Sequence, residues 1–119
     1  MDTTLSETQR LLADAIRAYF AREFPLASAQ QLDRTATRFS PQVWQDLARF
    51  GWLDIMRSSD APGEAALNAL VAVEELGYAG YVSPFLDSAV AAASLLVAAP
   101  TPEAGEVANA LAAGEVVAA

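Results

Sequence analysis

Two adjacent carboxylates, Glu74 and Glu75, are the side chains in this sequence that could most readily perform acid–base chemistry. Both fall in a segment with helical spacing, where neighbouring residues point about 100° apart. They therefore cannot both face one substrate atom. We expect a solvated helix face instead, with one carboxylate hydrogen-bonded to a neighbouring helix end. Asp46 is likewise assigned to a polar helix face, and Asp87 to the first turn of a helix, where it complements the helix dipole.

The residue types that the sequence lacks exclude several kinds of active site. It contains no Cys, no His and no Lys, and its seven basic residues are all Arg. Thiolate and imidazole metal ligands, Cys–His and Ser–His pairs, and Schiff-base lysines are therefore absent. Gly77 and Gly80 do not make a dinucleotide fingerprint, because a third glycine and a preceding strand are missing. We accordingly assign no catalytic residue, no metal ligand and no cofactor-binding residue.

Composition and charge describe one acidic domain. The chain has 119 residues, of which 54% are hydrophobic, so it can build a core without disulfides. Its formal charge of −8 argues against nucleic acid and anionic membranes, which need basic patches. The longest apolar stretch, residues 89–99, is shorter than the roughly 20 residues of a membrane span. Because residues 1–7 lack a secretory signal pattern, we predict a cytoplasmic protein without a membrane span.

Helix-start signals recur along the chain and predict an all-α bundle of about five helices. Ser6 and Gln9 have the spacing of a capping box. A cap residue followed by proline occurs at Ser40–Pro41, Ser83–Pro84 and Thr101–Pro102. The third helix is expected to open at Asp60 or Ala61. The expected breaks are Pro25, Gly51, Arg57–Gly63, Gly77–Val82 and Pro100, and Gly77 is expected to end the third helix. The expected core stripes are Leu12, Ile16, Tyr19 and Phe20 in the first helix, and Val43, Trp44, Leu47 and Phe50 in the second.

The predicted fourth helix is apolar nearly all round. Between residues 89 and 99 only Ser94 is polar. A helix of this kind is either buried on all sides by its own bundle or covered by another domain or subunit. The sequence leaves both alternatives open.

Four segments follow one another along the chain: LSETQRLLADAIRAYFAREF (5–24), SPQVWQDLARFGWL (40–53), VEELGYAGYVSPF (73–85) and NALAAGEVVAA (109–119). In this order they resemble the amino-terminal helical domain of the acyl-CoA dehydrogenases. The second is similar to the family's pattern Pro-x-x-x-Trp-x-x-Leu-x-x-x-Gly-Leu, and the third to its Glu-Glu-Leu-Gly helix end. The fourth looks like the segment that leads into the family's β-rich middle domain.

The resemblance implies an FAD-dependent enzyme that desaturates the α,β bond of an acyl-CoA thioester. In that family a Glu of the carboxy-terminal helical domain removes the α-proton, and the flavin takes hydride from the β-carbon. The flavin is held mainly by the middle and carboxy-terminal domains. Residues 1–119 are therefore expected to form the single α-helical N-terminal domain of a longer flavoenzyme. That domain would contribute acyl-pocket walls and interdomain contacts, and would be inactive alone.

The resemblance also suggests which residues face the acyl end of the substrate. The candidates are Tyr78, Ala79, Tyr81, Val82 and Phe85. They lie where a helix ended by glycine is followed by one that begins at Ser83–Pro84. Such a junction can shape an inter-helix cavity, but the two tyrosines fit core packing about equally well, and the sequence leaves both open.

One segment departs from the family pattern. Where many members have a Pro-Glu…Gly-Gly loop, this chain has RSSDAPGEA (57–65). The departure leaves two alternatives open: a standard fatty-acyl substrate, and the branch that acts on steroid side chains and other bulky CoA thioesters. Some members of that branch assemble from two different subunits. The implied partners are an acyl-CoA substrate, an electron-transfer partner and further subunits in a homo- or hetero-oligomer. The alternative is a non-catalytic helical interaction subunit of the same ancestry.

Overall fold

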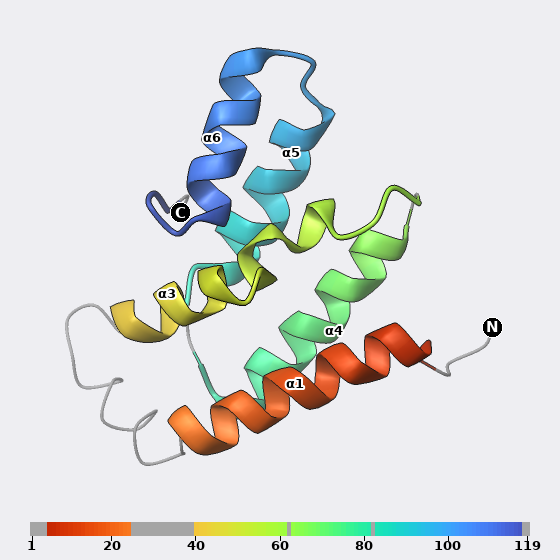
Figure 1. The fold of residues 1–119 in the computed structure, drawn as a ribbon, viewed down its shortest axis with the longest axis vertical. Coiled ribbons are helices and arrows are strands. Elements are labelled where there is room, and N and C mark those ends of the chain that lie inside the picture. Colours follow the sequence, from red (N-terminus) through yellow and green to blue (C-terminus); the bar gives the residue numbers. More distant parts are fainter. Residues whose placement is uncertain (1–4, 25–39, 62, 82, 118–119) are drawn as a thin grey trace.

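The computed structural model describes residues 5–24, 40–61, 63–81 and 83–117 (Figure 1). Within these residues every regular element is a helix, which confirms the predicted all-α fold with five α-helices. The elements are α1 (Glu7–Glu23), α3 (Pro41–Arg49), the 3-10 helix η1 (Trp52–Arg57), α4 (Glu64–Ala79), the π-helix η2 (Leu86–Ala92), α5 (Ala93–Ala98) and α6 (Pro102–Ala112). No helix in this part of the chain is long and apolar enough to cross a membrane.

Side chains cap three of the helices at the predicted positions. Ser6 accepts a hydrogen bond from the Gln9 backbone, and the Gln9 side chain accepts one from the Ser6 backbone, which completes the capping box of α1. Ser40 and Thr101 each accept from the backbone three residues further on. After α3, Gly51 adopts the left-handed conformation with φ 83°. These signals are local, so the sequence alone places them. The cap expected at Ser83 is the exception, because η2 begins at Leu86 without a side-chain cap.

The start of α4 was predicted too early. It was expected at Asp60 or Ala61, but the helix begins at Glu64. The residue before it, Gly63, has a φ of 85°, which a helix cannot contain, so the loop continues up to this point. Pro62, and likewise the predicted break at Pro25, lie outside the described residues.

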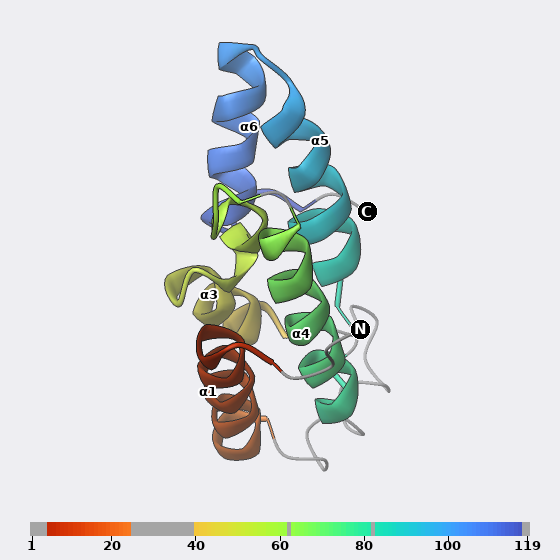
Figure 2. The ribbon, with the colours of Figure 1, turned by 90° about the vertical axis from the view of Figure 1, so that its right-hand side faces the viewer.

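The helices form a flat molecule of 43 × 36 × 21 Å. At one end α1 packs against α4, and at the other α5 and α6 form a hairpin (Figures 1 and 2). Between these ends, η1 contacts α3, α4, η2, α5 and α6. The 3-10 helix therefore connects the two halves of the molecule.

The core is shared by α1, α3, η1, α4 and the segment that follows α4. Its largest members are Ile16, Tyr19, Phe20, Phe24, Trp44, Leu47, Leu53, Ile55, Leu76, Tyr81 and Phe85. The predicted stripes are confirmed except at Phe50, which is 50% exposed. Phe50 is the C-cap of α3, where the chain turns away at Gly51, so its ring only reaches the edge of the core against Tyr19 and Trp52.

The apolar part of the predicted fourth helix, residues 89–99, is not central in the bundle. Ala89 and Ala93 are buried, but Leu95 is 75% exposed and Val97 is also exposed. The bundle of this chain therefore does not bury the helix on all sides.

Candidate functional site

The predicted pocket residues lie around the end of α4. This helix does not stop at Gly77, as was predicted, but continues to Ala79. Gly80 ends it with a φ of 73°, and the Tyr81 N–H donates to the Leu76 carbonyl at 3.1 Å. A glycine inside a helix costs only about 1 kcal/mol, which the packing of α4 against α1 outweighs at Gly77. The helix therefore gains almost one further turn.

The longer helix changes the environment of the predicted residues. Tyr78 belongs to the last turn of α4 rather than to a connection, and its side chain is 84% exposed. Tyr81 and Phe85 are both buried in the core. Ala79 is partly buried against it. Val82 lies outside the described residues.

Two grooves border this junction and divide the predicted residues between them. The first, the α1/α4 groove, has a volume of about 300 Å³ and is lined by Arg17, Phe20, Ala21, Phe24, Glu75, Tyr78 and Ala79. The second, the α4/η2 groove, has a volume of about 210 Å³ and is lined by Val73, Leu76, Gly77, Tyr81, Ser83, Phe85 and Leu86. Tyr78 and Ala79 thus face one groove, while Tyr81 and Phe85 face the other.

Tyr81 connects the linings of the two grooves. Its ring centroid lies 5.4 Å from that of Phe20 and 5.2 Å from that of Phe24, both of which line the α1/α4 groove. Its hydroxyl donates to the Ser40 carbonyl at 3.3 Å. Burial raises the pKa of the Tyr81 hydroxyl well above its ordinary value, so this side chain is a neutral wall and not an acid–base group.

An ion pair crosses the α1/α4 groove. Arg17 donates to the Glu75 carboxylate from Nε at 3.1 Å and from Nη2 at 2.7 Å. The guanidinium also lies 5.8 Å from the centre of the Tyr78 ring. The hydrogen bond to Glu75 and the charge of its carboxylate raise the pKa of Arg17. The sequence predicted that one of the paired carboxylates would bond to a neighbouring helix. That carboxylate is Glu75, but its partner is a side chain in the middle of α1 instead of a helix end.

A second buried carboxylate was missed by the sequence analysis. Asp46 was assigned to a polar helix face, which is wrong, because it is 9% exposed. The Tyr19 hydroxyl donates to it at 2.5 Å and Gln42 Nε2 at 3.1 Å, and Arg49 forms an ion pair with it. These donors satisfy the carboxylate, so Asp46 joins α1 to α3 and is not free for acid–base chemistry.

Helix N-termini are where a flavin pyrophosphate could bind, because their free N–H groups attract anions. In α1, α3 and α6 a cap side chain already accepts from one of these groups. The first turns of α4 and η2 carry the acidic residues Glu64 and Asp87, which repel phosphate. A flavin pyrophosphate at one of these helix ends would therefore compete with a cap side chain or face an acidic side chain.

These features define an all-α domain with apolar grooves and two buried, hydrogen-bonded carboxylates. A family model for "Acyl-CoA dehydrogenase, N-terminal domain" matches residues 6–115. The chain therefore belongs to the acyl-CoA dehydrogenase N-terminal domain family. No curated protein and no solved structure gives a significant match. The family is one of FAD-dependent oxidoreductases, and the match does not distinguish its branches.

Proposed function

We propose that this chain acts as the N-terminal domain of an FAD-dependent acyl-CoA dehydrogenase and forms the wall at the closed end of the acyl pocket. The catalytic base and the flavin site would belong to parts of the enzyme outside residues 1–119. The family match over residues 6–115 supports this role. The proposal includes an oligomeric cytoplasmic enzyme that passes its electrons to a separate acceptor.

The observation that carries the pocket assignment is the α4/η2 groove. It is lined by two buried aromatic rings, Tyr81 and Phe85, together with aliphatic side chains and the Cα of Gly77. Three charged residues adjoin it along the chain, and none of them lines it. Glu74 and Asp87 are exposed, and Glu75 lines the α1/α4 groove instead. An apolar groove with a hydroxyl from Ser83 at its edge suits the hydrocarbon part of an acyl thioester. These side chains would exclude water and set the depth available to the acyl group.

Two matched substitutions in the whole dehydrogenase test which groove receives the acyl group. Leu86→Phe adds bulk to the α4/η2 groove, and Ala79→Phe adds bulk to the α1/α4 groove. We expect Leu86→Phe to lower kcat/KM for a bulky acyl-CoA about tenfold or more relative to a short one, since a pocket discriminates size by roughly 1–3 kcal/mol. Ala79→Phe is expected to affect all substrates alike.

The outcome separates a pocket from simple packing. A selective loss in Ala79→Phe alone would move the acyl site to the α1/α4 groove. A uniform loss in both variants, together with a lower melting temperature, would remove these residues from the pocket. The bulky substrates also test the proposal that the enzyme belongs to the steroid or bulky acyl-CoA branch, because a wild-type preference for short acyl groups would contradict it.

A second candidate function is a non-catalytic subunit of the same ancestry. It is favoured by the engagement of both Glu75 oxygens by Arg17 and of Asp46 by three donors. Neither buried carboxylate is left to act as a base. Sequencing the native transcript beyond Ala119 discriminates the two functions. A reading frame that continues into a β-rich segment and a second helical domain supports the enzyme, and a stop codon supports the subunit.

A further inference from the structure

A third groove lies away from the proposed acyl pocket, between α5 and α6. This α5/α6 groove has a volume of about 320 Å³, and every residue that lines it is apolar. The lining is Ala92, Leu95, Leu96, Val107, Leu111, Val116 and Val117. Leu95 is 75% exposed, and Val107, Val116 and Val117 are each more than 40% exposed. A contiguous apolar surface of this kind is typical of an interaction site.

The charges of the chain are divided unevenly along the sequence. Residues 1–57 carry seven arginines and seven acidic residues, so the whole net charge of −8 comes from residues 58–119. That second part has eight acidic residues and no basic one. The ion pairs found among the described residues all lie outside α5 and α6. The acidic residues of α6 are therefore not neutralised by a neighbouring cation in this part of the structure.

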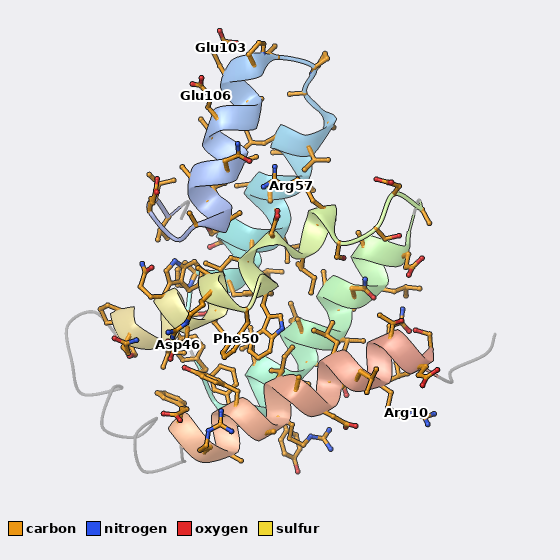
Figure 3. The ribbon with its side chains drawn as sticks, in the orientation of Figure 1. Arg10, Asp46, Phe50, Arg57, Glu103 and Glu106 are labelled. Carbon is orange, nitrogen blue, oxygen red and sulfur yellow. The ribbon has the colours of Figure 1, made fainter. Side chains whose placement is uncertain are left out.

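The acidic residues border the apolar groove. Glu103 precedes Val107 by four residues on α6, so the two share one helix face, and Glu106 flanks that face. Both project outward from the α5–α6 end of the molecule (Figure 3). Glu115 is exposed beside Val116. Arg57 approaches α6 through Asn109, at 2.8 Å, but Asn109 lies about half a turn from Val107 and Leu111, on the other side of the helix.

The apolar lining and the acidic border of the groove together determine what kind of surface can cover it. A second copy bound through the same surface would bring two acidic borders together, because a two-fold interface pairs a patch with itself. Like charges placed opposite each other oppose association. We infer that the α5/α6 groove binds a partner polypeptide, other than a second copy of this chain, whose contact surface is apolar at its centre and bordered by arginines or lysines. The inference does not depend on the acyl pocket.

Synthetic amphipathic helices can test this inference with the 119-residue chain. One labelled peptide carries a leucine stripe flanked by arginines, a second carries the same stripe flanked by glutamates, and a third has the first composition in scrambled order. We expect the arginine-flanked peptide to bind most tightly by fluorescence anisotropy. The Glu103→Gln/Glu106→Gln variant should bind it about two- to tenfold more weakly and with less dependence on salt.

A matched pair of leucines locates the binding surface. Leu95→Ser, in the groove, should weaken binding about tenfold, as expected for an interface anchor. Leu11→Ser should not, because Leu11 is similarly exposed, at 63%, but lies on α1. Circular dichroism checks that both variants keep their helix content. The inference would be overturned if the glutamate-flanked or the scrambled peptide bound as tightly as the arginine-flanked one. It would also be overturned if Leu95→Ser and Leu11→Ser weakened binding equally, or if the arginine-flanked peptide did not bind. A dimer in sedimentation that Leu95→Ser abolishes would overturn it as well, because a second copy would then be the occupant.

Discussion

Arg17 on α1 donates two hydrogen bonds to the Glu75 carboxylate on α4, across 58 positions of sequence. The two ends of this interaction differ in their surroundings, since the Arg17 side chain is largely exposed and Glu75 is 7% exposed. The ion pair therefore satisfies a buried charge at the contact between the two longest helices.

Removing the buried carboxylate should destabilise the domain. Glu75→Ala loses both hydrogen bonds and leaves space between α1 and α4, so we expect the free energy of unfolding to fall by about 1–3 kcal/mol. The control is Glu23→Ala, which removes the exposed pair with Arg22 and should cost less than about 1 kcal/mol. Urea denaturation measures both changes. Equal losses in the two variants would show that burial adds nothing to the Arg17–Glu75 contact.

The raised pKa of the Tyr81 hydroxyl predicts that the folded domain loses stability at alkaline pH. Burial raises the pKa of this hydroxyl in the folded state, whereas in the unfolded chain the value is about 10. Stability is therefore fully present below pH about 10 and falls as the pH rises above it, because the unfolded chain releases the proton more readily. Tyr19 acts in the same direction, since burial and then the charge of Glu23 raise its pKa.

The Tyr81→Phe variant isolates this contribution. Urea midpoints measured from pH 8 to pH 11 should decline less steeply in Tyr81→Phe than in the wild type. Tyr78→Phe is the control, because the Tyr78 side chain is 84% exposed and should leave the decline unchanged. If the urea midpoint of Tyr81→Phe falls as steeply with pH as that of the wild type, the loss of stability comes from other groups.

Replacing either of two glycines three residues apart by alanine should change the free energy of unfolding, but with opposite signs. Gly77 lies inside α4 with open space where the Cβ of an alanine would lie, so Gly77→Ala should stabilise by about 0.5–1 kcal/mol. Gly80 has a φ of 73°, so Gly80→Ala should destabilise by about 1–2 kcal/mol. Thermal denaturation distinguishes the two. The reverse order would mean that α4 ends at Gly77.

Residues 1–119 alone should bind no stoichiometric flavin and oxidise no acyl-CoA. The physical reason is that a cap side chain already accepts from one first-turn amide in each of α1, α3 and α6, and that the buried carboxylates are already hydrogen-bonded. Absorbance of the purified chain after incubation with FAD, and reduction of an artificial electron acceptor with an acyl-CoA, provide the measurement. A yellow protein, or turnover, would disprove the expectation.

Features that depend on neighbouring residues were predictable from the sequence. The caps Ser6, Ser40 and Thr101 and the turn at Gly51 each need only a few adjacent residues, and the structure places them where they were expected. The end of α4 was not predictable, because Gly77 and Gly80 carry the same local signal. The choice between them depends on how α4 packs against α1.

The buried carboxylates were not predictable for a related reason. Asp46 and Glu75 look like ordinary surface residues of amphipathic helices, and their partners Tyr19 and Arg17 lie 27 and 58 positions away. A single sequence gives no sign of such pairings. The division of the predicted pocket residues between two grooves has the same origin, since one additional helical turn moved Tyr78 and Ala79 away from Tyr81.

The π-helix η2, from Leu86 to Ala92, bears on which changes of length the chain can accept. A π-helical turn holds one residue more than an α-helical turn does, within the same helix. Deleting one residue between Leu86 and Ala92 would convert the turn to α-helix and leave both flanks in register. Phe85 would keep its place in the core, and Leu95 would keep its place on the surface. Relatives of this chain that are one residue shorter in this helix are therefore compatible with the same fold.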